Sequence, residues 1–491
     1  MTAQSPRTPS LAVSLVPVVV LVGLLAASVA LFGDSSSGGA NQIALILASG
    51  VGVLIGVFYG HSWPSLERGI VEGISLAMGA IIILLMVGAL IGSWILGGIV
   101  PTMIYYGLGL LTPAVYYPSA CVICSLVSLA TGSSWTTAGT VGVALVGIAT
   151  AQDLNVGLAA GAIISGAYFG DKMSPLSDTT NLAPAMAGTD LFTHIRHMLW
   201  TTTPSWLLAI ILFTVIGLMG SPPRDTSAVD AILQALDSSF VIGPHMLIPV
   251  ALVLGMVAFK MPAYPALLLG ALVGCLFGIV FQPAAVLGYA ASPDLPSWAA
   301  LLKGVWMALF DGFKLSSGNA ALDELLSRGG MSSMLSTVWL ILSAMMFGAV
   351  MEAVGMLQRI AASILGMVHG TGSLIAATLV TSFGMNVVAS DQYIAIVLPG
   401  RMFRAEYARR QLHPKNLSRA LEDAGTLTSS LVPWNTCGAF MSQTLGVATF
   451  TYAPFAFFNL LNPLVSLAYG FTGFTIERLP QHPPAPDEGP R

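Results

Sequence analysis

Long apolar runs, separated by short polar stretches, make up most of this sequence of 491 residues. A helix needs about 20 apolar residues to cross a bilayer. Several runs are too short or too broken to cross alone, and we interpret these as half-helices or re-entrant segments. The pattern predicts an all-α polytopic membrane protein with about 10–13 transmembrane helices. The runs lie at 11–32, 40–60, 73–99, 114–131, 137–151, 156–170, 198–219, 243–260, 262–283, 298–313, 333–357, 370–388, 391–400 and 447–475.

Composition supports a membrane protein and narrows its partners. Hydrophobic residues make up 55% of the chain and charged residues 8%, against about 25% charged residues in an ordinary soluble domain. The net charge of -4 gives no reason to expect a nucleic-acid partner. The partner that this composition predicts is the lipid bilayer. Cys121 and Cys124 form one C-x-x-C inside an apolar run, where we expect small packing residues and no metal site.

The ends of the chain and its basic residues predict the orientation. We expect residues 1–10 to be a cytoplasmic tail, 11–475 the transmembrane domain and 476–491 a disordered, proline-rich cytoplasmic tail. Run 11–32 exceeds the about 7–15 apolar residues of a secretory signal, so we predict a first spanning helix in the inner membrane. Positively charged loops face the cytoplasm. One short loop, which we therefore expect on the cytoplasmic side, is expected to contain Arg401, Arg404, Arg409, Arg410, Lys415 and Arg419.

Two halves of the sequence resemble each other, at about 73–219 and 333–475. Each half carries a polar stretch, followed some forty residues later by a second one rich in acids, hydroxyls and proline: 131–137 and 170–184 in the first half, 382–391 and 422–436 in the second. We match Asp171 with Asp423, Ser174 with Thr426, and Asp178 with Ser430. Such paired, interrupted segments are typical of a binding site between two inverted repeats with broken or re-entrant helices.

Four acids lie within or beside apolar sequence: Asp171, Asp178, Asp391 and Asp423. A charge at the bilayer centre costs about 2.5–3.5 kcal/mol, so several together indicate a function. For Glu352 and Asp190, the alternative interpretation is a helix-end carboxylate that reaches water.

Hard oxygen ligands suit a bare cation, and a carboxylate binds either Na⁺ or H⁺. Pro175 and Pro184 cannot continue a helix interior, so we expect the segment between them to unwind and release carbonyl oxygens. We hypothesise that Asp178 is the exchanging acid, because hydroxyls and an amide surround it in the sequence whereas Lys172 follows Asp171. The candidate Na⁺/H⁺ site comprises Ser133, Thr136, Asp171, Ser174, Ser177, Asp178, Thr179, Asn181, Asn386, Asp391, Asp423, Thr426, Ser429 and Asn435.

Three other functions remain to be weighed. A transporter of a small organic anion such as malate or lactate needs a basic partner in the core. Lys172 is the one candidate, and it has three open roles: pairing with an acid, capping a helix end or meeting an anion. A membrane serine hydrolase using Ser133 or Ser134 with His194 or His197 leaves the second half unexplained. A passive channel does not require titratable acids in both halves.

The motifs at residues 131–140, 170–184, 188–197 and 422–446 resemble those of the NhaC family of bacterial Na⁺/H⁺ antiporters, as does the overall length and hydropathy. The resemblance implies a secondary antiporter of the plasma membrane, with inverted repeats, no cofactor and no enzymatic activity. Some relatives exchange malate and 2H⁺ for lactate and Na⁺, so the family leaves the substrate open. Small-x-x-x-small patterns at 52–56 and 88–92 suit a homodimer or, as we favour, close packing within one chain.

Overall fold

The computed structural model describes residues 7–32, 39–220, 226–318 and 320–479. Apart from one bridge between Leu412 and Arg478, the regular secondary structure of these residues is helical. Nine of the described helices are long and apolar enough to cross a membrane, or up to 11 if each of two bent helix pairs forms one span. The predicted all-α membrane fold with broken helices is confirmed.

The first half of the chain forms helices that closely follow the apolar runs. One run, 73–99, belongs to two helices, because the chain turns at Ala77 between α3 and α4. The bounds are α1 Leu11–Phe32, α2 Ala40–Phe58, α3 Trp63–Leu76, α4 Met78–Leu96, α5 Ile99–Leu110, α6 Pro113–Thr131, α7 Ser134–Thr137, the π-helical turn η2 Ala138–Gly142, α8 Val143–Ala151, α9 Val156–Met173, α10 Asp178–Ala187 and α11 Leu191–Met219.

A middle segment connects the two halves, and the second half then repeats the alternation of long and short helices. The middle segment contains α12 Thr226–Ser239, η3 Pro244–Leu247, α13 Ile248–Ala258, α14 Ala263–Phe281, α15 Pro283–Ala290, α16 Ser297–Asp311, α17 Ala320–Leu326 and η4 Met331–Met334. The second half contains α18 Leu335–Ala353, α19 Met356–Leu365, α20 Thr371–Val388, α21 Gln392–Arg409, α22 Pro414–Leu421, the π-helical turn η5 Glu422–Thr426, η6 Ser429–Leu431, α23 Thr436–Leu445, α24 Thr449–Tyr452, η7 Ala453–Phe455 and α25 Phe457–Thr472.

The helix boundaries recur at a constant spacing in the two halves. Helices α6, α7, α9 and α10 begin at residues 113, 134, 156 and 178, whereas α20, α21, α22 and α23 begin at 371, 392, 414 and 436, each 258 residues later (371 minus 113). Turn residues in the left-handed conformation share this spacing: Gly132 matches Ser390, and Asp153 matches Gln411. These boundaries support the predicted repeat, and its inverted sense stays a prediction.

This spacing changes which residues correspond. Pro175 matches Pro433, and Ser177 and Asn435 both cap the helix that follows. Asp171 therefore matches Ser429, six residues beyond the expected partner Asp423 (429 minus 423). The expected pairs were matched by their acidic side chains. The helix caps and breaks give a different alignment of the two halves, and this alignment is the one that the backbone follows.

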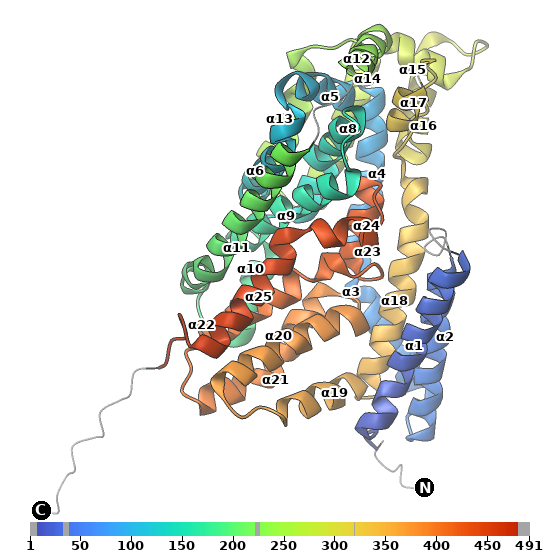
Figure 1. Ribbon diagram of the computed structural model, residues 1–491. Helices are drawn as coiled ribbons and strands as arrows, with labels where there is room; N and C mark the ends of the chain where they lie inside the picture. The colour runs from blue at the N-terminus through green and yellow to red at the C-terminus, as the bar shows by residue number, and fades with distance from the viewer. Residues whose placement is uncertain (1–6, 33–38, 221–225, 319, 480–491) are drawn as a thin grey trace, which may run out of the picture.

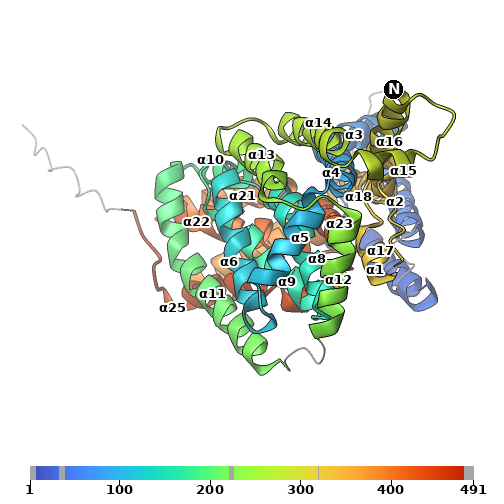
Figure 2. The ribbon, with the colours of Figure 1, turned by 90° about the horizontal axis from the view of Figure 1, so that it is seen from above.

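Helix α9 is the buried centre of the first half. Of its 18 residues, 16 are buried, and it lies among α6, α8 and α11 (Figure 2). Glycines let α6 approach closely: a Cβ atom on Gly166 would lie 2.1 Å from the carbonyl oxygen of Cys121. Small residues at a helix contact allow such backbone approach in membranes. Cys121 and Cys124 are free, buried packing residues on α6, as expected.

The small-x-x-x-small patterns also pack within the chain. Added Cβ atoms on Gly52 and Gly56 would lie 2.8 Å from side-chain atoms of Val350 and Val354, respectively. Those on Gly88 and Gly92 would meet backbone oxygens of the middle segment, at 2.5 and 2.2 Å. These glycines therefore pack against other helices of the same chain, and the homodimer stays a prediction.

Two expectations about the basic region need correction. Arg401, Arg404 and Arg409 lie on α21 and Arg419 lies on α22, so the expected loop is only the turn 410–413 between two helices. Arg419 is also buried, with 1% of its surface exposed. The first residues of the expected disordered tail pack against this turn, where the backbone oxygen of Glu477 accepts a hydrogen bond from His413 N at 3.0 Å. Residues 480–491 and 1–6 of the expected tails lie outside the described residues.

We expect a membrane-impermeant maleimide to reach cysteines at Arg409 and Asp294 from opposite sides of the membrane. The α21–α22 turn and the α15–α16 connection lie at opposite ends of the molecule (Figure 1), and the basic turn should be cytoplasmic. The measurement uses intact cells and everted vesicles, with the four native cysteines replaced. Labelling of both positions from one side would contradict this orientation.

We expect Gly166→Val to lower the unfolding temperature of the purified protein in detergent. The new side chain meets the α6 backbone, and overpacking of this kind costs about 1–3 kcal/mol. Gly50→Val on α2 is the matched control, because nothing lies within 4 Å of a Cβ added there. Equal unfolding temperatures for the two variants would show that the α6–α9 contact is not tight.

Candidate ion-binding site

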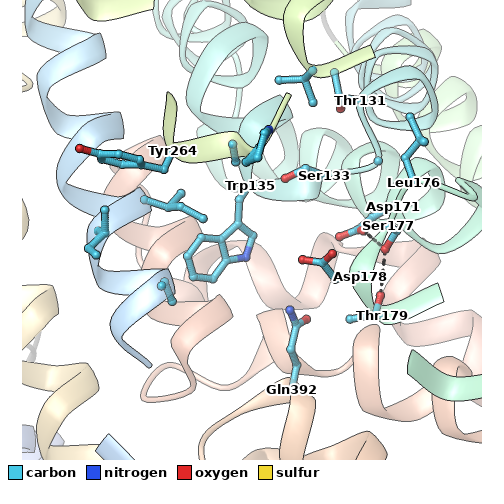
Figure 3. A pocket seen from close by; sticks show the side chains of 18 of the residues that line it. Thr131, Ser133, Trp135, Asp171, Leu176, Ser177, Asp178, Thr179, Tyr264 and Gln392 are labelled. Atoms are coloured by element: carbon cyan, nitrogen blue, oxygen red, sulfur yellow. Dashed lines mark hydrogen bonds between the residues drawn. The ribbon is translucent and has the colours of Figure 1, made fainter. Parts of the chain in front are cut away.

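A cavity of about 1260 Å³ lies where the broken helices of both halves meet. Figure 3 shows its lining side chains, with Asp171, Ser177 and Asp178 grouped on one wall. The walls come from α4, from the segments around residues 131–135, 171–179 and 391–393, and from the α13–α14 turn. Polar side chains distant in the sequence therefore share one space.

The first wall of the cavity is the break between α9 and α10. Helix α9 ends at Met173, residues 174–177 are not helical, and α10 begins at Asp178, with Ser177 as its N-cap. We expected unwinding from Pro175 to Pro184, but Pro184 lies inside α10. The expectation is wrong for this part, because the Ser177 cap restarts the helix directly after the break.

Asp171 is the inner carboxylate of this wall. It is 7% exposed, and it accepts hydrogen bonds from Ser134 Oγ at 2.6 Å, from Ser134 N at 3.2 Å and from Ser177 Oγ at 2.6 Å. Its carboxylate therefore ties the start of α7 to the start of α10. Ser133, the N-cap of α7, lines the cavity beside it.

Asp178 is the outer carboxylate. It is exposed at the first position of α10, where backbone N–H groups favour a negative charge. Figure 3 shows its carboxylate beside that of Asp171. The oxygen-rich neighbours expected to surround it bond elsewhere: Thr179 donates to Glu422, Thr180 to backbone oxygens of residues 171 and 172, and Asn181 to those of Pro175 and Ser177.

The second half contributes Asp391, which lies at the equivalent of Ser133 and caps α21. It is 4% exposed and accepts from the backbone N of Tyr393 and Ile394 at 2.9 and 3.1 Å. Thr436, the first residue of α23, lies 3.5 Å from its other oxygen. Acids of both halves thus line one cavity.

The structure divides the predicted site residues into two groups. Six line the cavity: Ser133, Asp171, Ser177, Asp178, Thr179 and Asp391. The others are absent from its lining: Thr136, Ser174, Asn181, Asn386, Asp423, Thr426, Ser429 and Asn435. Several of these stabilise the breaks, since Asn386 donates to the Gly425 oxygen at 2.7 Å and Asn435 caps α23.

Asp423 belongs to a second, enclosed polar centre. Its Oδ1 lies 2.5 Å from Lys172 Nζ, and both side chains are 0% exposed. Thr201 and Asn462 donate to the same oxygen at 3.1 and 2.7 Å, and Arg419 Nε lies 4.0 Å from Oδ2. Of the three open roles of Lys172, the structure shows pairing with an acid, and that acid comes from the other half.

Sequence reasoning missed Glu422, Arg419, Thr201 and Asn462 as members of this centre. Asp423, which we expected in one site with Asp171, does not line the cavity, because other side chains enclose it. The partners of Asp423 lie up to 251 positions away along the chain (423 minus 172), so no local motif reports them. The one available signal is that charges inside a membrane pair with one another.

The hydrolase arrangement is not formed among the described residues. Ser134 Oγ donates to Asp171, and His194 Nδ1 contacts Ser418 Oγ at 2.8 Å. Asp190 caps α11 and Glu352 is exposed near the end of α18, as helix-end carboxylates do.

Comparison with known proteins identifies the family. Residues 166–474 match the Na⁺/H⁺ antiporter family. The chain is 40% identical to the Na⁺/H⁺ antiporter NhaC of Alkalihalophilus pseudofirmus, over 89% of this chain and 91% of that one. It is 37% identical to the malate-2H⁺/Na⁺-lactate antiporter of Bacillus subtilis, over 88% and 89%. It is 34% identical to the arginine/ornithine antiporter ArcD of Halobacterium salinarum, over 95% and 93%. The chain therefore belongs to the Na⁺/H⁺ antiporter family.

Proposed function

We propose that the chain exchanges Na⁺ for H⁺ across the plasma membrane, and that Asp171 and Asp178 bind either ion. The observation that carries this proposal is the pair of carboxylates side by side at the cavity (Figure 3). Ionising two neighbouring carboxyl groups in a partly dry site costs free energy, because their negative charges repel each other. A cation between them relieves the repulsion, and either Na⁺ or a proton meets this need.

The two carboxylates have different parts in this proposal. Asp178 is exposed to the cavity, so an entering cation meets it first. Asp171 is buried and held in place by three hydrogen bonds, so it forms the fixed inner end of the site. Hydroxyl oxygens of Ser133 and Ser177 at the same cavity supply further hard ligands.

Organic-anion exchange coupled to Na⁺ and H⁺ is the second candidate. The cavity is large for a bare cation, and the first residues of α10, α21 and α23 line it. Helix N-termini attract anions, and the exposed Lys260 lies on the same cavity. Relatives of similar identity carry the names of both kinds of antiporter, so identity does not choose between them.

Purified protein in liposomes with an imposed pH gradient should change the pH of the lumen when Na⁺ is added, because protons move in the direction opposite to Na⁺. Challenge with Na⁺, Li⁺, K⁺, malate, lactate and arginine in turn assigns the substrate class. A response to Na⁺ alone supports Na⁺/H⁺ exchange. A response that requires an organic acid together with Na⁺ would favour the second candidate.

We expect Asp171→Asn and Asp178→Asn each to reduce Na⁺-driven proton movement at least about tenfold, because either change removes half of the carboxylate pair. Asp178→Glu keeps the charge and should retain part of the activity with a displaced pH profile. Asp190→Asn, at the cap of α11, is the matched control for removal of an acid. Normal exchange by Asp178→Asn would shift the site to Asp171 and Asp391.

A further inference from the structure

A row of four oxygens connects the cavity with a carboxyl group inside the protein. Ser177 Oγ lies 2.6 Å from Asp171 Oδ1 and 3.1 Å from Thr179 Oγ1. Thr179 Oγ1 in turn lies 3.0 Å from Glu422 Oε1. The row therefore begins at the inner carboxylate of the proposed ion site in the first half and ends on η5 in the second.

The number of protons on this row is limited. Three oxygen–oxygen contacts need three protons, and the hydroxyls of Ser177 and Thr179 bring two. The third must sit on a carboxyl, either Asp171 or Glu422. With the proton on Glu422, every hydroxyl donates toward Asp171, and with the proton on Asp171, both hydroxyls reverse. The two arrangements differ only in which O–H bonds are made, so a proton can pass from one end to the other.

Glu422 is the end at which an uncompensated charge costs most. Its side chain is 0% exposed, and among the described residues its Oε2 has no partner in good hydrogen-bond geometry, although the hydroxyl of Thr426 lies near this carboxyl. The neighbouring Lys172 is bonded to Asp423. An ionised carboxylate with one bare oxygen in such a place is unfavourable, and a protonated one is not.

The charges around Glu422 set how many cations the region accepts. The ionisable groups that act on Glu422 include Asp171 and Lys172 of α9. Beyond them lie Asp423, Arg419 of α22, and His194 and His197 of α11, which neighbour Lys172 and Arg419. Tyr407 of α21 and Tyr469 of α25 lie near Arg419, α10 adds the water-exposed Asp178, and α20 carries no acid or base. With both histidines neutral, Lys172, Arg419 and Asp423 leave one positive charge, which Asp171 and Glu422 balance when they share one proton. One Na⁺ in place of that proton preserves the balance.

We infer that Glu422 is a second proton-binding carboxyl, and that the hydroxyls of Ser177 and Thr179 pass its proton to and from Asp171. The inference rests on the proposed Na⁺/H⁺ exchange and deepens it. The proton leaves Glu422 Oε1 for Thr179 Oγ1, whose own proton moves to Ser177 Oγ, whose own moves to Asp171 Oδ1. Na⁺ at Asp171 then excludes a proton held on Glu422, although the two ions occupy different carboxyl groups.

The test is the pH dependence of ²²Na⁺ binding to the purified protein. When one proton is displaced by each Na⁺, the dissociation constant for Na⁺ rises about tenfold for each unit by which the pH falls below the titration of the row. Glu422→Gln keeps the shape and the acceptor for Thr179 but cannot hold the proton. We expect its dissociation constant to change less than about twofold per unit over the same range, because the variant lacks the carboxyl group that would hold the displaced proton. The matched control is Glu352→Gln, which removes an exposed acid and should keep the tenfold dependence.

A second variant separates the path from the carboxyl. Thr179→Val interrupts the row while both carboxyls remain, so we expect the pH dependence of binding to persist and the rate of Na⁺-driven proton movement to fall at least about tenfold. Thr179→Ser restores the hydroxyl and should restore the rate. If Glu422→Gln does not fold, Thr179→Val and Thr179→Ser still test whether the proton passes along this row.

Four results would overturn the inference. A tenfold dependence per pH unit in Glu422→Gln would show that Glu422 does not hold the exchanged proton, and a normal rate in Thr179→Val would show that the proton does not pass through this row. Loss of Na⁺ binding at every pH in folded Glu422→Gln would make Glu422 part of the Na⁺ site instead. If the wild-type protein shows no Na⁺-driven proton movement, the proposed function falls and this inference with it, whereas the first three readings leave the proposed function standing.

Discussion

The ion pair between Lys172 and Asp423 is the interaction on which the arrangement of this protein depends. A charged group inside a membrane protein has little water to solvate it, so it must find its partner within the fold. Here the partners stand 251 positions apart in the chain, one in each half. The pair ties the end of α9 to η5, and it forms the core of the enclosed polar centre, apart from the lining of the cavity.

The helix breaks position the remaining polar side chains of the cavity. Each break ends with a capping side chain, and the capping residues Ser133, Ser177 and Asp391 face the same cavity. A cap satisfies backbone N–H groups that water cannot reach in a bilayer. The same side chains that permit the chain to break inside the membrane therefore also place oxygens where an ion can bind.

The apolar pattern predicted the spans well because hydrophobic length is a local property. The expected run 11–32 coincides with α1, and the run 370–388 differs from α20 by one residue. The break near Pro175 was also predictable, since proline and serine mark it directly. The partners of Asp171 were not, because Ser134 reaches it only through the packing of α7 against α9. Glu422 and Arg419 fall in a stretch whose charges suggest a solvated loop, and only their burial shows that they belong to the interior.

The equal spacing of the helix boundaries also limits how the length of the chain can vary. From the start of α6 to the start of α10, and again from the start of α20 to the start of α23, successive helices begin at the same intervals along the chain. One residue inserted there would rotate the following helix by about 100° and turn its cap away from the cavity. The segment from α12 to α17 has no such counterpart and carries no carboxylate of the cavity. Natural length differences, fused reporter domains and protease sites therefore belong in the exposed connections of that segment, such as the one between α15 and α16.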